Sequence, residues 1–287
     1  MIIQWYPGHM DKALRQMKDS IKLVDAIIYV LDARAPYSCI NPKYKELIGD
    51  KPAIIVLNKA DLVDESELIF WENAFQELGY DVVRLNSTIT NATKIMLAKV
   101  EKTLKDKIER NKAKGVHLPL RLMVIGVPNC GKSTLINNVC ANKKTITGDK
   151  AGVTRANQWV KIGGNYEMLD TPGTLWPSFD NEKVARNLAY IGSIKDEVVD
   201  IEGLAYAFID DLKLKYFNNL VERYNLKTSI ASETIHIFDE ICLNRGFKLR
   251  GNEIDYTRGA KAIIDDFRKG RIGKIILDDL KELNDAF

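Results

Sequence analysis

Residues 126–133, with the sequence GVPNCGKS, constrain this chain more than any other segment. They fit the pattern G-x-x-x-x-G-K-[ST], in which glycines let successive backbone N–H groups surround a phosphate, the lysine adds a charge and the hydroxyl holds Mg²⁺. The segment lies between a predicted strand at residues 120–125 and a predicted helix whose positive end favours an anion. We therefore expect phosphate contacts from Asn129, Cys130, Gly131, Lys132, Ser133 and Thr134.

The rest of the chain predicts a mostly parallel sheet with helices on both faces. Apolar runs at residues 26–31 and 53–57 predict buried strands, residues 81–86 predict a third strand, and residues 155–162 and 166–169 predict a hairpin. Residues 91–114 predict one long helix, and Asp64 with Glu67 has the spacing of a capping box. Strands that alternate with helices indicate an α/β fold.

Strand signals fade after residue 179, and the remainder reads as helices. We expect a nucleotide-binding domain over residues 1–178 and a smaller all-helical domain over residues 179–287. The chain has 287 residues, which is long enough for two such domains.

Residues 58–61, NKAD, have the pattern of a loop that recognises the base of a bound nucleotide. They follow a buried strand, and ligands of open α/β sheets bind at the carboxyl ends of the strands. The Asp61 carboxylate can accept two hydrogen bonds from guanine, whereas adenine lacks those donors and would leave it unpaired. The stem of Lys59 can lie over the ring, and Asn58 can bond its edge or brace the phosphate loop. With Ala60, and with Asn86 and Ser87 after the next strand, these residues predict GTP in preference to ATP.

Residues 170–173, DTPG, follow a short apolar strand. We expect Asp170 to hold Mg²⁺ together with Ser133, and the Gly173 N–H to meet the γ-phosphate. Thr154 lies upstream, where a threonine can close over Mg²⁺ in the GTP state and release on hydrolysis.

The water-positioning glutamine of Ras-like proteins is absent, because Thr174 and Leu175 follow Gly173. Hydrolysis is therefore slow, or another group positions the water. Asn129 inside the phosphate loop can be a ligand for K⁺, which would neutralise charge as an arginine finger does elsewhere.

The order of the motifs is circularly permuted, because NKAD and Asn86-Ser87 precede the phosphate loop, Thr154 and DTPG. With WYPGHM at residues 5–10 and DARAP at residues 32–36, the chain resembles the ribosome biogenesis GTPase A family (RbgA/YlqF). Residues 245–251 and 267–273 extend the resemblance to nearly the whole chain.

This resemblance implies a circularly permuted P-loop GTPase that acts late in assembly of the large (50S) ribosomal subunit. It implies binding to the pre-50S particle and its rRNA, which would stimulate hydrolysis of GTP to GDP. It also implies an activating, catalytic role for His9. The family carries a hydrophobic residue where this chain has Thr174, so the chain departs from the pattern there.

Two segments are locally basic, although the net charge is only +3. Residues 99–121 contain eight Lys and Arg against three Asp and Glu, and residues 243–274 contain nine against four. Such clusters can neutralise RNA phosphates, and solvated helix faces are the alternative explanation. The candidate RNA-binding residues are Arg245, Lys248, Arg250, Arg258, Lys269 and Arg271.

Other classes fit less well. The four cysteines form no C-x-x-C pair, which disfavours the zinc site of permuted GTPases that act on the small subunit. The chain has no long apolar run or signal-peptide pattern, so we expect a cytoplasmic protein without membrane contact. A monomer is the default expectation for its oligomeric state. A non-catalytic, GTP-dependent RNA- or ribosome-binding module remains the alternative to an enzyme.

Overall fold

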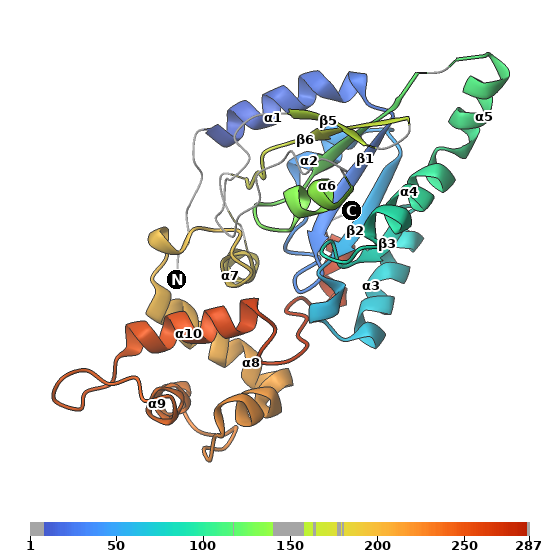
Figure 1. Cartoon of the computed structure of the whole chain (residues 1–287). Helices are drawn as coiled ribbons and strands as arrows, with labels where there is room; N and C mark the ends of the chain where they lie inside the picture. Colours follow the sequence, from blue (N-terminus) through green and yellow to red (C-terminus); the bar gives the residue numbers. More distant parts are fainter. Residues whose placement is uncertain are drawn as a thin grey trace.

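The computed structural model describes residues 9–116, 118–139, 158–162, 165–176, 179 and 181–285. It contains a six-stranded sheet with helices on both faces and a group of helices at one end (Figure 1). None of the helices in these ranges is long and apolar enough to cross a membrane.

The sheet has the strand order β3-β2-β1-β4-β6-β5. Neighbouring strands pair in parallel, except that β5 runs antiparallel to β6. All seven residues of β1 are buried, as expected for a central strand covered on both faces. The strands are β1 (Ala26–Asp32), β2 (Ala53–Asn58), β3 (Asp81–Leu85), β4 (Leu120–Ile125), β5 (Gln158–Ile162) and β6 (Tyr166–Asp170). The mostly parallel α/β sheet predicted from the sequence is therefore confirmed.

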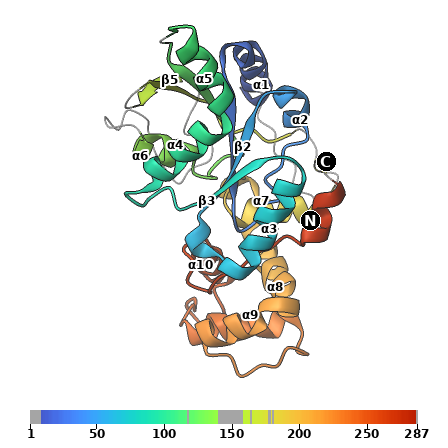
Figure 2. The same cartoon turned by 90° about the vertical axis from the view of Figure 1, so that its right-hand side faces the viewer.

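Helices α4 and α6 lie on one side of the sheet and α1 and α2 on the other (Figure 2). The helices around the sheet are α1 (His9–Ser20), α2 (Lys43–Ile48), α3 (Glu65–Glu77), α4 (Ala92–Thr103), α5 (Lys105–Ala113) and α6 (Lys132–Val139). The short 3-10 helices are η1 (Ile21–Leu23), η2 (Ala60–Leu62), η3 (Asp196–Val198) and η4 (Leu280–Asp285).

Helix α3 begins where the sequence predicts, because the Asp64 carboxylate accepts from the backbone N–H groups of Ser66 and Glu67. The second half of the predicted capping box is wrong. The Glu67 carboxylate accepts instead from Lys215 in a later helix, at 2.7 Å. The end of α3 is followed by Gly79, whose φ of 87° suits a residue without Cβ.

The single long helix predicted over residues 91–114 is wrong, because the chain forms α4 and α5 with a break at Leu104. Helix α4 buries Ala92, Met96 and Val100 at helical spacing, whereas α5 has no buried side chain. Helix α4 therefore packs closely against the sheet, whereas α5 contacts the core through the partly buried Ile108 and extends beyond the sheet (Figure 1).

Within residues 181–285 the α-helices lie at the carboxyl end of β1 (Figure 1). They are α7 (Glu182–Tyr190), α8 (Ile201–Tyr224), α9 (Thr234–Asn244) and α10 (Tyr256–Arg268). The Phe208 ring lies 4.9 Å from the rings of both Tyr190 and Phe267, which joins α7, α8 and α10 in one aromatic cluster. The C-terminal helical region predicted from the sequence is confirmed.

The end of the chain returns to the sheet. The Asp278 carboxylate accepts from the Ser38 backbone N–H at 2.9 Å, from the Ser38 hydroxyl at 2.5 Å and from the Asn187 amide at 2.8 Å. All three residues are buried. A buried polar network thus connects the segment after β1 with α7 and the C-terminal tail. The domain boundary at residue 178 stays a prediction.

Candidate nucleotide-binding site

The phosphate loop lies between β4 and α6, in the order that its motif requires. Gly126 and Gly131 have φ of 151° and 100°, and a Cβ at Gly126 would lie 2.3 Å from the carbonyl oxygen of Val30. Lys132 is 5% exposed, and its ammonium donates to the carbonyl oxygens of Gly126 at 3.0 Å and Val127 at 2.8 Å. The loop therefore holds its lysine inward, beside its own backbone.

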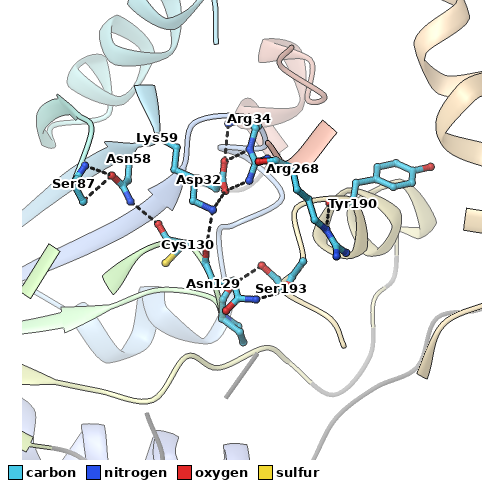
Figure 3. A network of polar contacts seen from close by, with 12 residues as sticks. Asp32, Arg34, Asn58, Lys59, Ser87, Asn129, Cys130, Tyr190, Ser193 and Arg268 are labelled. Carbon is cyan, nitrogen blue, oxygen red and sulfur yellow. Dashed lines mark hydrogen bonds and ion pairs between the residues drawn. The ribbon is translucent and has the colours of Figure 1, made fainter. Parts of the chain in front are cut away.

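Asn58 joins three loops (Figure 3). Its Nδ2 donates to the Cys130 carbonyl oxygen at 2.8 Å, and its Oδ1 accepts from the Ser87 N–H at 3.0 Å and the Ser87 hydroxyl at 2.7 Å. A Cβ at Gly131 would lie 2.1 Å from Asn58 Nδ2. Asn58 therefore takes the bracing role considered from the sequence. The Ser87 N–H is engaged with Asn58, and Asn86 accepts from the Thr88 N–H, so the expected contact to guanine stays a prediction.

The NKAD turn ends β2 with a left-handed residue, since Lys59 has φ of 59°. The Lys59 ammonium donates to the Asn129 carbonyl oxygen at 2.9 Å, which ties this turn to the phosphate loop. Ala60 and Asp61 form the start of η2, and Asp61 is exposed. Asp61 is therefore at the surface of the turn, and its contact to guanine stays a prediction.

The DTPG segment lies against the phosphate loop. The Ser133 hydroxyl donates to Asp170 Oδ2 at 3.4 Å, so the two expected Mg²⁺ ligands are neighbours. Asp170 is buried, and a hydroxyl beside a carboxylate suits the oxygen preference of Mg²⁺. A Cβ at Gly173 would lie 2.7 Å from Pro128 and 2.9 Å from the Lys132 ammonium. Thr134 lies in the first turn of α6, and Thr154 lies outside the described residues.

Asn129 connects the phosphate loop to the C-terminal helices. It has φ of 58°, and its Nδ2 donates to the Gly192 carbonyl oxygen at 2.7 Å, just after α7. The Ser193 hydroxyl donates to the Pro128 carbonyl oxygen at 2.7 Å. The phosphate loop and the loop after α7 therefore touch through two hydrogen bonds. The K⁺ site expected at Asn129 stays a prediction.

Thr174 faces the protein interior. It is fully buried, and its hydroxyl lies 2.6 Å from the Tyr44 hydroxyl. The next residue, Leu175, is buried and donates its N–H to the sulfur of Met10 at 3.3 Å. His9 precedes Met10 and starts α1, while the side chain of His9 lies outside what the structure describes.

Several candidate RNA-binding residues have intramolecular partners. Arg271 contacts Asp265 and Asp266, and Lys269 pairs with Asp265 at 2.8 Å. Arg245 lies 3.8 Å from Asp266 and its guanidinium lies over the Tyr224 ring. Arg258 lies over the Phe247 ring, Lys248 donates to Asn252 at 2.8 Å, and Arg250 is exposed in the loop between α9 and α10. Among the six candidate RNA-binding residues, Arg245, Lys269 and Arg271 therefore lie beside carboxylates of the protein itself.

Sequence reasoning gave no role to Asp32 and Arg34, which stand at the end of β1. Asp32 is fully buried and lies 2.9 Å from the Lys59 ammonium. Burial alone would raise the pKa of Asp32, but the positive charges of Arg34 and Lys59 outweigh it and hold the pKa well below its usual range. The available signal was a carboxylate at the end of an otherwise wholly apolar strand.

Comparisons with known proteins fit this site. A family model described as "50S ribosome-binding GTPase" matches residues 121–238. The chain is 38% identical to ribosome biogenesis GTPase A of Bacillus cereus, over 99% of this chain and 96% of the relative. It is 34% identical to mitochondrial ribosome-associated GTPase 1 of Ictalurus punctatus, over 96% and 92%.

Two solved structures share the fold at 24% identity. GNP-bound YlqF from T. maritima has a TM-score of 0.64, covering 93% of this chain and 97% of the other. A GDP-bound YlqF structure has a TM-score of 0.66, covering 93% and 100%.

Proposed function

The chain belongs to the ribosome biogenesis GTPase A family and is a GTP hydrolase, and we propose that it assembles the large ribosomal subunit. In this proposal it binds the pre-50S particle and its rRNA in the GTP state and leaves after hydrolysis. The supporting observation is the contact between the phosphate loop and the loop after α7, through Asn129 and Ser193. Nucleotide state can thereby bias the C-terminal helices directly.

The guanine nucleotide binds across the carboxyl ends of β1, β2 and β4 in this proposal. Asp61 reads the base, Lys59 covers it, and Asn58 holds the base-reading and phosphate loops in register. The direct bond from Asn58 to Cys130 supports this arrangement. The phosphates lie at residues 129–134, where α6 presents its positive end.

Magnesium is held by Ser133 and Asp170, with Thr154 as the third contributor in the GTP state. The proximity of Ser133 and Asp170 supports the first pair. When bound, Mg²⁺ neutralises charge on the phosphates. K⁺ binds beside Asn129 and adds positive charge where charge develops during hydrolysis.

Slow intrinsic hydrolysis follows from Thr174. Its hydroxyl bonds Tyr44 in the interior, so it does not orient a water at the γ-phosphate. We assign activation to His9, brought into place by the ribosomal particle. The contact between Leu175 and Met10 supports this, because it sets the residue after His9 against the segment that follows Gly173.

The partner is the pre-50S particle, and the exposed loop between α9 and α10 is the proposed rRNA contact. Arg250 and Lys248 lie on this loop, and Leu249 beside them is 52% exposed. Exposed cations next to an apolar side chain suit a phosphate backbone with unstacked bases. A monomer in the cytoplasm is part of the same proposal.

Sedimentation of 50S particles tests this function. Purified protein is mixed with 50S particles from a strain that lacks this factor, with GTP, GDP or a non-hydrolysable GTP analogue. We expect the protein to pellet with the particles in the analogue and to remain in the supernatant with GDP. Equal pelleting in both nucleotides, or none in either, would contradict the proposal.

A further inference from the structure

The segment after β1 contacts both the base-reading turn and the C-terminal helices. It begins with Asp32 and Arg34, and neither residue has a role in the function proposed above. Arg34 is 2% exposed and Asp32 is fully buried. Charged side chains are rarely buried to this degree unless they are paired, so their partners indicate what they do.

Asp32 holds two cations. Arg34 donates from Nε to Asp32 Oδ1 at 2.9 Å and from Nη2 to Oδ2 at 2.7 Å, which is a bidentate pair. The Lys59 ammonium contacts Asp32 Oδ2 at 2.9 Å and is 27% exposed along its side chain. The ammonium therefore has one charged anchor and one neutral anchor, the Asn129 carbonyl oxygen.

Arg34 extends this cluster to α10. Its Nη1 donates to the Arg268 carbonyl oxygen at 3.1 Å, and its guanidinium lies 5.0 Å from the centre of the Phe267 ring. The Arg34 carbonyl oxygen accepts from the Leu277 N–H at 2.8 Å. Arg34 is thus fixed on one side by Asp32 and on the other by the end of α10 and the C-terminal tail.

The contacts close into a ring (Figure 3). The Arg268 side chain donates to the carbonyl oxygens of Ala189 and Tyr190, at 2.8 and 2.9 Å. Beyond Ile191, Gly192 and Ser193 bond the phosphate loop. Both nucleotide loops therefore reach α10, one through Asp32 and Arg34 and the other through the loop after α7.

We propose that Asp32 is a positioning residue that holds the Lys59 side chain where it binds the guanine nucleotide. Arg34 bonds both Asp32 and α10, so the position of Lys59 depends on the contact between the C-terminal helices and the segment after β1. A free lysine loses much rotamer freedom when it is ordered over a base. A lysine whose ammonium is already held by two acceptors has less freedom to lose, so the nucleotide binds more tightly. The proposal rests on the role of Lys59 given above.

A double-mutant cycle tests the link between Asp32 and Lys59. The dissociation constant of a fluorescent N-methylanthraniloyl GDP is measured for the wild type, Asp32→Asn, Lys59→Met and the double variant. We expect Asp32→Asn to weaken binding about tenfold in the wild-type background and less than about twofold beside Lys59→Met. Equal weakening in both backgrounds, or none in either, would overturn the proposal.

The cycle also separates this proposal from the one it rests on. If Lys59→Met leaves GDP affinity unchanged, the base-covering role of Lys59 is wrong and the inference falls with it. If Lys59→Met weakens binding and Asp32→Asn does not, only the inference is wrong.

A second variant avoids the buried charge that Asp32→Asn leaves on Arg34, which can unfold the protein. Arg268→Ala removes the side-chain bonds to Ala189 and Tyr190 and the ion pair with Asp196, while Asp32, Arg34 and Lys59 keep their bonds. We expect about threefold weaker binding of the fluorescent GDP. Lys261→Ala, at an exposed position of the same helix, is the control. If Asp32→Asn does not unfold cooperatively, the test rests on Arg268→Ala alone. An affinity of Arg268→Ala for the fluorescent GDP equal to that of Lys261→Ala would then overturn the proposal.

Discussion

The backbone N–H of Leu175 donates to the sulfur of Met10 across 3.3 Å, so the segment after Gly173 rests on the first turn of α1. In sequence these two residues are 165 positions apart. Because His9 precedes Met10, the segment after Gly173 contacts the residue that directly follows His9.

We expect His9→Ala to spare GTP binding and to lower 50S-stimulated turnover by at least about tenfold, as loss of a proton-transfer or water-positioning group does. Steady-state phosphate release with and without 50S particles measures this. Lys12→Ala, an exposed position on the same helix, is the control. Stimulated turnover at the wild-type rate in His9→Ala would exclude the role.

Asn129 predicts a dependence on the monovalent cation. Wild-type turnover in KCl should exceed turnover in NaCl by at least about tenfold, because a correctly placed charge stabilises the transition state. Asn129→Ala should remove this difference. GDP affinity in both salts is measured in parallel, because the variant also loses the bond to Gly192. Equal wild-type rates in the two salts would refute the K⁺ site.

If Asp61 reads the base, a substitution there should change the preference from guanine to xanthine. Asp61→Asn replaces an acceptor by a donor, so GDP affinity should fall by at least about 100-fold and xanthosine diphosphate should bind better than GDP. Titration with both diphosphates measures this. Asp61 is exposed, so the change should leave the melting temperature near that of the wild type. Unchanged preference for GDP would show that Asp61 does not read the base.

Asp278 predicts a pH-dependent stability. Burial raises the pKa of Asp278 from 3.8 to about 6, although Ser38 and Asn187 donate to its carboxylate. Between these values the folded state binds more protons than the unfolded state, so stability from this group rises as pH falls through 6 and is complete below 3.8.

From pH 7 to pH 5 the free energy of unfolding should gain about 1 kcal/mol from Asp278. Urea unfolding of the wild type and Asp278→Asn at both pH values measures it, with the pH-induced change compared between the two proteins. The variant should lack this gain. The same pH-induced change in both proteins would contradict the assignment.

Arg250 and Arg245 should contribute unequally to RNA binding. Arg250 is exposed on the loop between α9 and α10, whereas Arg245 lies 3.8 Å from the Asp266 carboxylate. Arg250→Ala should reduce the slope of log affinity against log salt by about 0.7 to 0.9, the value of one phosphate contact. Arg245→Ala should change the slope less. Titration of 23S rRNA in 50–200 mM KCl, roughly the range in which such slopes are measured, checks this; equal slopes in all three proteins would exclude Arg250.

The sheet and the nucleotide loops were predictable because their signals are local. The segments 26–31 and 53–57 are unbroken apolar runs, and residues 126–133 and 58–61 carry their chemistry in adjacent positions. The backbone angles of Gly126 and Gly131 explain why the motif needs glycine there. The break at Leu104 was not predictable, because helical propensity continues through it and only the full burial of side chains ends there.

The contacts between distant segments were also beyond sequence reasoning. Ser38 and Asp278 are 240 positions apart, and Arg34 and Arg268 are 234 apart. No local pattern marks such a pair, because each member alone is an ordinary polar residue. Tertiary packing also decides that the Thr174 hydroxyl bonds Tyr44 in the interior.

GTP turnover in KCl and Mg²⁺, with and without purified 50S subunits, tests the central claim most directly. The account predicts slow turnover of the protein alone and a large stimulation by the 50S subunit, with 30S subunits giving none. Tight GTP binding with no stimulation by 50S particles would contradict a ribosome-activated GTPase and would leave a GTP-dependent binding module.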